Sequence, residues 1–161
     1  MSALEMAVIG TGALGRHHAR ILSELPGVKL VAVADTNPRA VAETAERCGT
    51  QAVADYHELI GRVQAVVVAV PTSGHCRVAG DFLAAGTDVL VEKPIAASVA
   101  EAQELVSLAE EHEAILQVGH IERFNPGLVA ARPFLFDPDT SASSAMRRFR
   151  FVRRTSASST T

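Results

Sequence analysis

Short apolar segments alternate with longer amphipathic segments along the chain as far as residue 118. The short segments are rich in Val, Ile, Leu and Ala and favour buried parallel strands, whereas the longer ones have the apolar spacing of helices. The expected strands are residues 6–9, 30–34, 51–53, 65–70, 88–91 and 115–118. The expected helices are residues 15–25, 38–48, 55–60, 74–85 and 99–112. This alternation predicts an α/β fold with a doubly wound parallel sheet.

Capping residues mark where two of these helices begin. Asn37 precedes Pro38, and proline is favoured at the first helical position behind a capping asparagine. Ser98 is followed three residues later by Glu101, which is the spacing of a capping box. Asn125 and Pro126 have the same cap-and-proline order as Asn37 and Pro38.

The pattern changes after Pro126. Residues 128–136 can begin a helix, although Pro133 and Pro138 limit its length. Residues 137–161 are largely Ser, Thr and Arg and show no period of strand or helix. We interpret the chain as a single domain with a disordered C-terminal tail, divided into a domain at 1–125, the start of an interdomain segment at 126–136, and the tail at 137–161.

A glycine motif joins the first expected strand to the first helix, and an acid ends the second strand. The first glycine permits a tight turn, the second lets the backbone approach a pyrophosphate, and the third lets the helix pack close to the strand. Free N–H groups at the helix start face the diphosphate, and Asp35 accepts hydrogen bonds from the adenosine ribose. This pattern predicts a Rossmann dinucleotide site. Its expected cofactor contacts are Gly10, Gly12, Ala13, Leu14, Gly15 and Asp35.

Asp35 also predicts NAD in preference to NADP, because its charge repels a 2′-phosphate. Arg39, four residues further on, offers partial compensation for that charge. The alternative is a glycine-rich turn in a Rossmann domain that binds another ligand or none.

Polar residues follow the fourth expected strand, at the edge of the sheet where open α/β folds bind ligands. They include Pro71, Thr72 and His75, and we expect all three to lie along a cofactor. His75 can contact the nicotinamide ribose or, equally, can meet solvent at the start of a helix.

The fifth and sixth expected strands are also followed by residues whose side chains can bind a ligand or take part in catalysis. Glu92, Lys93 and Pro94 follow the fifth strand, and we expect Glu92 and Lys93 to contact the cofactor. From its position, Lys93 either reaches the crevice, to orient a nicotinamide or bind a substrate hydroxyl, or is a surface lysine. His120 and Arg123 follow the sixth strand and suit an anionic or sugar ligand, the alternative being packing at a helix entry. We expect the side chains of His17 and His18 to be exposed to solvent or packed against the protein rather than to contact the pyrophosphate.

Composition narrows the functional classes. The net charge of -3 gives no electrostatic case for nucleic acid, and no apolar run is long enough to cross a membrane. The first strand begins too early for a signal peptide, so we expect a cytoplasmic protein. The two cysteines form no C-x-x-C pair and are expected to be free thiols, and no cluster has metal-ligand spacing.

These motifs together resemble one family. In chain order they are V-I-G-T-G-A-L-G-R-H-H-A, V-A-D, P-T-S-G-H, E-K-P and V-G-H-I-E-R-F-N-P. They look like the nucleotide-binding half of the Gfo/Idh/MocA oxidoreductases, over about residues 5–130. The resemblance implies an NAD(P)-dependent oxidoreductase that acts on a sugar, nucleotide-sugar or cyclitol hydroxyl, with Lys93 beside nicotinamide and substrate. It also favours roles for His75 and His120, and we predict Lys93 and His120 as the catalytic residues.

The stretch G-H-I-E-R-F-N-P is similar to that of bacterial UDP-N-acetylglucosamine 3-dehydrogenases, which implies a nucleotide-sugar substrate.

The resemblance to this family stops short of its second domain. Members of the family carry a second domain that supplies an Asp and a His to the active site and usually the oligomer interface. Nothing after residue 130 resembles that domain, so relatives are expected to be homo-oligomers through a part that this chain lacks.

We hypothesise that the tail arose from a change of reading frame. With codons chosen from GC-rich alternatives, a shifted frame over residues 146–161 resembles the family's continuation, and a gene without an open alternative frame past residue 161 would refute the idea. Three functions remain open: the oxidoreductase, a stand-alone NAD(H)-binding module, and an inactive truncated product. Turnover separates the first from the others, and cofactor titration separates the second from the third.

Overall fold

The computed structural model describes residues 2–135. The predicted tail, with its hypothesised change of reading frame, lies outside the described residues. The chain divides into two compact units, one ending at His120 and the other beginning at Ile121. The first unit is the α/β domain, and its last residue precedes the boundary at residue 125 that the sequence predicts.

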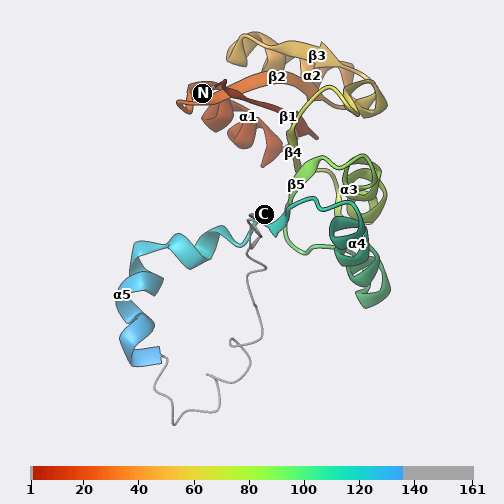
Figure 1. The fold of residues 1–161 in the computed structure, drawn as a ribbon. Coiled ribbons are helices and arrows are strands. Elements are labelled where there is room, and N and C mark those ends of the chain that lie inside the picture. The colour runs from red at the N-terminus through yellow and green to blue at the C-terminus, as the bar shows by residue number, and fades with distance from the viewer. Residues whose placement is uncertain (1, 136–161) are drawn as a thin grey trace, which may run out of the picture. The chain divides into compact units, whose positions relative to one another are not determined.

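The first unit contains a six-stranded sheet (Figure 1). Its strands are β1 (Leu4–Ile9), β2 (Val28–Ala34), β3 (Gln51–Val53), β4 (Ala65–Val68), β5 (Asp88–Val91) and β6 (Leu116–Val118). Its helices are α1 (Gly15–Glu24), α2 (Pro38–Cys48), α3 (His75–Ala84) and α4 (Val99–Glu111), with 3-10 turns η1 (Tyr56–Leu59) and η2 (Thr72–Gly74). Every neighbouring pair of strands is parallel, in the order β3-β2-β1-β4-β5-β6. This topology confirms the predicted doubly wound Rossmann sheet.

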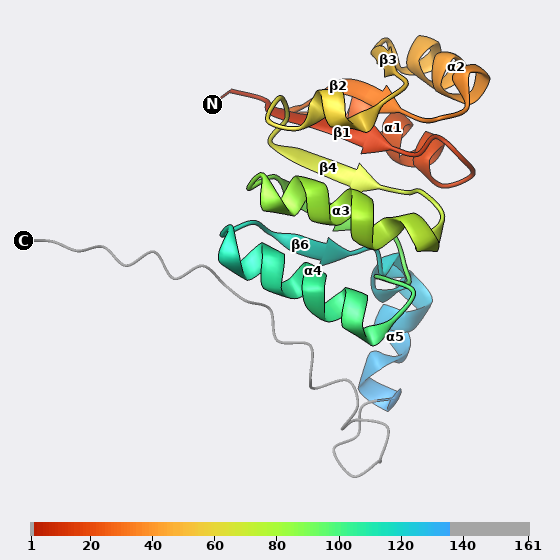
Figure 2. The ribbon, with the colours of Figure 1, turned by 90° about the vertical axis from the view of Figure 1, so that its right-hand side faces the viewer.

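Alternate residues of the strands enter two separate cores. On one face, α1 and α2 pack on the sheet, and the buried residues are Val8, Ala19, Leu22, Val33, Val41, Ala45 and Val67. On the other face, α3 and α4 lie side by side over the second half of the sheet (Figure 2). Phe82, Leu83 and Leu105 are fully buried there against Ile9, Val66 and Val68. The aliphatic strands therefore bury both faces, as parallel strands require.

The observed elements differ from the predicted ones mainly at their ends. The fourth strand ends at Val68 rather than residue 70, because the chain turns away after the N–H of Ala69 donates to the carbonyl of Ile9. The helix predicted at 74–85 begins as the 3-10 turn η2 and becomes α-helical at His75. The short helix predicted at 55–60 is the 3-10 turn η1.

Both predicted helix caps are present. The Asn37 side chain accepts hydrogen bonds from the N–H groups of Arg39 and Ala40. Ser98 accepts from the N–H of Glu101, and the Glu101 carboxylate accepts from the N–H of Ala97, one residue before the cap. These bonds satisfy N–H groups that a helix start leaves without partners.

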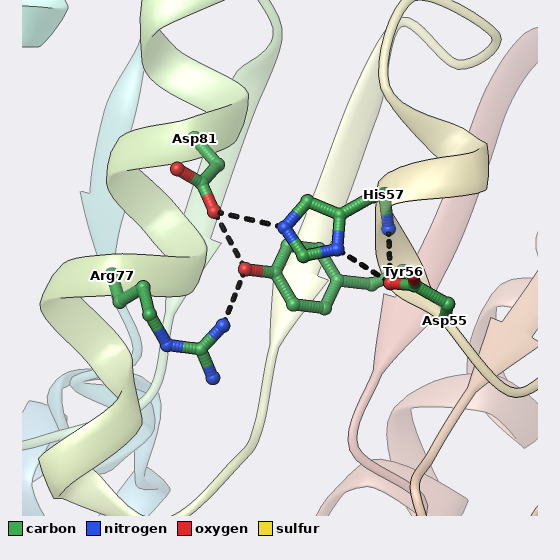
Figure 3. Close-up of polar contacts among 5 residues, drawn as sticks. All are labelled: Asp55, Tyr56, His57, Arg77 and Asp81. Carbon is green, nitrogen blue, oxygen red and sulfur yellow. Dashed lines mark hydrogen bonds and ion pairs between the residues drawn. The ribbon is translucent and has the colours of Figure 1, made fainter.

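A polar network holds η1 on α3 (Figure 3). The Tyr56 hydroxyl donates to Asp81 at 2.5 Å and accepts from Arg77 at 2.7 Å. His57 lies between two carboxylates, with Nδ1 on Asp55 and Nε2 3.7 Å from Asp81. Burial, followed by the hydrogen bond and charge of Asp81, raises the pKa of Tyr56 to about 12.

The second unit contains the 3-10 turn η3 (Ile121–Phe124) and helix α5 (Pro126–Leu135). Asn125 immediately precedes α5, as predicted. Its side chain accepts a hydrogen bond from the N–H of Gly127 at 2.9 Å. The predicted helix at 128–136 starts earlier than expected, and it continues past Pro133. Arg123 of this unit lies over the ring of Phe124.

Candidate cofactor site

The register of the sheet brings the predicted site residues to one edge. Ile9 pairs with Ala34 and Val68, Val68 pairs with Val91, and Val91 pairs with Val118. These residues are the last of their strands, so the segments that follow them meet at the carboxyl edge. The glycine loop lies at the centre of that edge, where β1 has β2 on one side and β4 on the other. This is the switch point at which open α/β sheets bind ligands.

The three motif glycines have different surroundings. Gly10 has φ +92°, and a Cβ on it would lie 2.6 Å from the carbonyl oxygen of Ala69. A Cβ on Gly15 would lie 1.7 Å from the carbonyl oxygen of Gly10. A Cβ on Gly12 would meet no atom within 4 Å. The turn and the close packing of helix on strand therefore explain two glycines, whereas the open space at Gly12 is where a cofactor's pyrophosphate would lie against the backbone.

The N-terminus of α1 faces that open space. Gly12, Ala13 and Leu14 are exposed, and within residues 2–135 no side chain caps this helix. Its first N–H groups and its dipole suit an anion. The residues of the loop therefore fit a dinucleotide diphosphate.

Asp35 is held in place by the loop. Its Oδ2 accepts from the backbone N–H of Thr11 at 2.6 Å and from the Thr11 hydroxyl at 3.0 Å, and its Oδ1 accepts from the N–H of Asn37 at 2.8 Å. Partial burial raises the pKa of Asp35, but hydrogen bonds from Asn37 and Thr11 outweigh it and hold the pKa below the usual 3.8. The carboxyl group is therefore an ionised acceptor at neutral pH.

His75 does not meet solvent. It is 1% exposed, its Nδ1 lies 2.8 Å from the carbonyl of Pro94, and its Nε2 lies 2.9 Å from the carbonyl of Val70. This burial leaves no ring nitrogen for the nicotinamide ribose, so the predicted contact is corrected: the ring joins the loops after β4 and β5. Of its predicted neighbours, Pro71 is exposed and Thr72 is half-buried at the edge.

Glu92 is a buried carboxylate at the end of β5. It is 5% exposed, its Oε1 lies 2.7 Å from Nε2 of His18, and its Oε2 accepts from the backbone N–H of Lys93 at 3.2 Å. A Cβ on Gly119 would lie 3.2 Å from the same carboxyl group. Both carboxylate oxygens of Glu92 thus have protein partners, so the predicted cofactor contact of this side chain is corrected: the carboxylate joins α1 to the segment after β5.

Lys93 and His120 remain on the exposed edge. They follow the neighbouring strands β5 and β6, and both are exposed. Lys93 is joined to Pro94 by a cis peptide bond. Sequence reasoning missed Thr11, which occupies a variable position of the glycine motif, and it did not foresee that His18 pairs with Glu92, 74 residues away.

Other candidate chemistry lies away from the glycine loop. A hollow of about 560 Å³ between α3 and α4 has Cys76, Arg77 and Glu104 on its walls and no residue of the loop. Over the described part of the chain, no group of His, Cys, Asp or Glu is placed to hold a metal ion. In the same part, no helix is long and apolar enough to cross a membrane. Both cysteines are free thiols, as predicted.

Comparison with known proteins agrees with this geometry. Residues 4–120 match the Gfo/Idh/MocA family, described as an oxidoreductase family with an NAD-binding Rossmann fold. The chain belongs to this family. The matched residues contain the whole sheet and its carboxyl edge. The resemblance inferred from the five motifs is thereby confirmed.

Two similar proteins are by name dehydrogenases of a nucleotide sugar and of a cyclitol. A UDP-N-acetylglucosamine 3-dehydrogenase of Acidithiobacillus ferrooxidans is 35% identical over 78% of this chain and 39% of its own length. An inositol 2-dehydrogenase of Rubrobacter xylanophilus is 38% identical over 80% of this chain and 38% of its own. The crystal structure of GenD2 from gentamicin A biosynthesis, in complex with NAD, superimposes with a TM-score of 0.81 at 34% identity, covering 85% of this chain and 40% of GenD2. The chain thus spans about two fifths of the length of these relatives.

Proposed function

We propose that this chain is the cofactor-binding part of an NAD-dependent oxidoreductase that acts on a sugar, nucleotide-sugar or cyclitol hydroxyl. The observation that carries the proposal is the open space at Gly12, beside a loop whose other two glycines are closed in by backbone. The uncapped start of α1 and the ionised Asp35 support it, because they suit the diphosphate and the adenosine ribose. The names of the relatives support the substrate class.

The side chains at the carboxyl edge would each have a separate role in the reaction. NAD, when bound, would take up the hydride of the carbinol carbon, and the hydroxyl proton would pass to a base from the second domain that family members carry. Lys93, exposed at the end of β5, orients the nicotinamide end and holds the substrate hydroxyl. His120, at the end of β6, contacts the sugar from the neighbouring position. Asp35 fixes the opposite end of the cofactor.

The same geometry supports NAD over NADP. Asp35 is an anion that the N–H groups of Thr11 and Asn37 hold at the end of β2. A 2′-phosphate would bring like charge to that carboxylate and would remove the ribose hydroxyl that it accepts from. Arg39 does not offset this charge in the structure, because its guanidinium pairs with Glu43 at 2.9 Å.

A stand-alone NAD(H)-binding module is the second candidate. It is supported by the family match, since residues 4–120 contain the glycine loop and all six strands of the sheet. Under this proposal the domain binds and releases NAD(H) without acting on a sugar. An inactive product would bind neither form of the cofactor.

A pair of glycine substitutions tests the proposal. Gly12→Ala places a methyl group in the open space where the pyrophosphate would lie, and Gly12→Val fills more of it. Gly80→Ala is the control, because Gly80 lies on α3 and its Cβ would make ordinary contact, at 3.4 Å, with Leu108 of α4. We expect calorimetry to show NAD affinity lowered at least about tenfold by Gly12→Ala and abolished by Gly12→Val, with unchanged circular dichroism. Undiminished affinity in Gly12→Val would refute the site.

A further inference from the structure

The Glu92 carboxylate joins three segments of the carboxyl edge. It receives Nε2 of His18 from α1 on one oxygen and the backbone N–H of Lys93 on the other. Because a carboxylate only accepts, the Nε2 atom of His18 carries the proton of this bond. The contact therefore connects the helix that begins at the glycine loop with the backbone of the lysine beside the proposed nicotinamide position.

Gly119 limits where the carboxylate can lie. An added Cβ would be 3.2 Å from Cδ and from both oxygens of Glu92, so the end of β6 packs directly on this group. The carboxylate thus has backbone against one side, His18 on the second and Lys93 on the third. It is 5% exposed, whereas the His18 side chain is 21% exposed at the rim.

A carboxylate buried to this extent is unfavourable unless donors surround it. Within residues 2–135, His18 is the only side chain that bonds to it. Without His18 the carboxylate would lose its charged or polar partner and turn toward water, and the N–H of Lys93 would lose its acceptor. Through Glu92, α1 thus contacts the start of the segment after β5, next to the place where His75 holds the carbonyl of Pro94.

We propose that His18 is a positioning residue, which fixes Lys93 relative to the glycine loop by holding Glu92. The proposal rests on the proposed function, because the cofactor must span the loop and Lys93 for this distance to matter. His18 touches neither cofactor nor substrate in this role. Its effect is confined to the nicotinamide end of the cofactor, since the adenosine end is held by Asp35 on the other side of β1.

Two ligands separate this role from a structural one. NAD reaches both the loop and Lys93, whereas ADP-ribose lacks the nicotinamide. Dissociation constants of both are measured by calorimetry for the whole 161-residue chain and for His18→Leu, His18→Gln and Lys93→Met. His17→Leu is the matched control, because His17 is the exposed neighbour of His18 on the same helix.

We expect His18→Leu to raise the dissociation constant of NAD about fivefold and to leave that of ADP-ribose within about twofold. His18→Gln should restore NAD binding, because its amide N–H replaces the donor, and His17→Leu should change neither ligand. In a Lys93→Met background, His18→Leu should weaken NAD no further, since the two residues act through one contact. If His18→Leu does not fold, Glu92→Gln should give the same selective loss.

Other outcomes would overturn the proposal. Equal weakening of NAD and ADP-ribose would mean that His18 acts on the glycine loop and not on Lys93. Additive losses in the double variant would mean that the two residues are independent. Unmodified protein that binds neither ligand would instead refute the proposed function itself, which keeps the two failures distinct.

Discussion

At the scale of residues, contacts within the protein account for some residues of the glycine loop but not for Gly12. Gly15 is required by the fold, because a side chain would overlap the Gly10 carbonyl, whereas nothing in the described structure fills the space at Gly12. The protein itself explains Thr11, since this residue is 4% exposed and its hydroxyl donates to Asp35. The residue between two motif glycines thus holds Asp35, the acid proposed to bind the ribose.

We predict that Thr11→Val narrows the preference for NAD over NADP. The substitution keeps the shape and the backbone N–H but removes one donor from Asp35, and it should lower the free energy of unfolding by about 1 kcal/mol. The ratio of the two dissociation constants, measured by calorimetry, should fall several-fold, and Thr11→Ser should restore it. Thr44→Val is the control, because the Thr44 hydroxyl bonds only within α2. A wild-type chain that binds NADP more tightly would disprove the role of Asp35.

The pH dependence of Thr11→Val follows from the same bonds. The folded pKa of Asp35 lies below the 3.8 of the unfolded chain, so its contribution to stability is present above 3.8 and is lost as pH falls through the lower folded value. Removing the Thr11 hydroxyl brings the two pKa values closer together. Thermal unfolding should therefore show a smaller difference between variant and wild type at low pH than at neutral pH.

At the scale of elements, η1 is joined to α3 by Tyr56. This side chain is the only tyrosine in the 161 residues, so its ionisation can be followed by absorbance without interference from another phenol. Burial and Asp81 raise its pKa to about 12, whereas Arg77 lowers it by a smaller amount. The contact of Tyr56 with Asp81 thus depends on the protonated hydroxyl.

We predict that tyrosinate absorbance titrates with a midpoint near 12 in the folded chain and near 10 in urea. The folded pKa is the higher of the two, so the stabilising effect is complete below about 10 and is lost as pH rises toward about 12. The stability advantage of the wild type over Tyr56→Phe should therefore shrink across that interval. A midpoint near 10 in the native protein would show that Asp81 does not hold the hydroxyl.

At the scale of the whole molecule, the described residues would provide one wall of the proposed reaction site. Lys93 and His120 lie on an exposed edge, and hydride transfer requires the donor carbon to be held close to the nicotinamide in a water-poor site. The relatives are about two and a half times as long as the matched segment, which is 39% of one relative and 38% of another. We expect the opposite wall to come from the part of the relatives that this chain does not match.

We therefore predict that the 161-residue polypeptide binds NAD but does not oxidise sugars by itself. The purified chain would be supplied with NAD and a panel of UDP-sugars and cyclitols while NADH absorbance is followed. An inositol 2-dehydrogenase relative with inositol is the positive control. Steady turnover by the chain alone would show that the described residues complete the site.

The sequence by itself determined the alternating elements, the topology class and the glycine loop. These features are readable because periodicity, capping residues and glycine spacing are local: Asn37 caps α2 and Ser98 caps α4 as their patterns predict. The motif also placed Asp35 at the end of β2. Local patterns thus fixed which segments reach the carboxyl edge.

Only the tertiary structure decided how the side chains at that edge meet. Thr11 and Asp35 are 24 residues apart and His18 and Glu92 are 74 apart, and no periodicity links either pair. From the sequence, His75 can contact the nicotinamide ribose or meet solvent at a helix start, but in the structure its ring nitrogens lie on the carbonyls of Pro94 and Val70 in the loops after β5 and β4. Such contacts depend on the register of parallel strands and on the packing of α1, which join residues from distant segments.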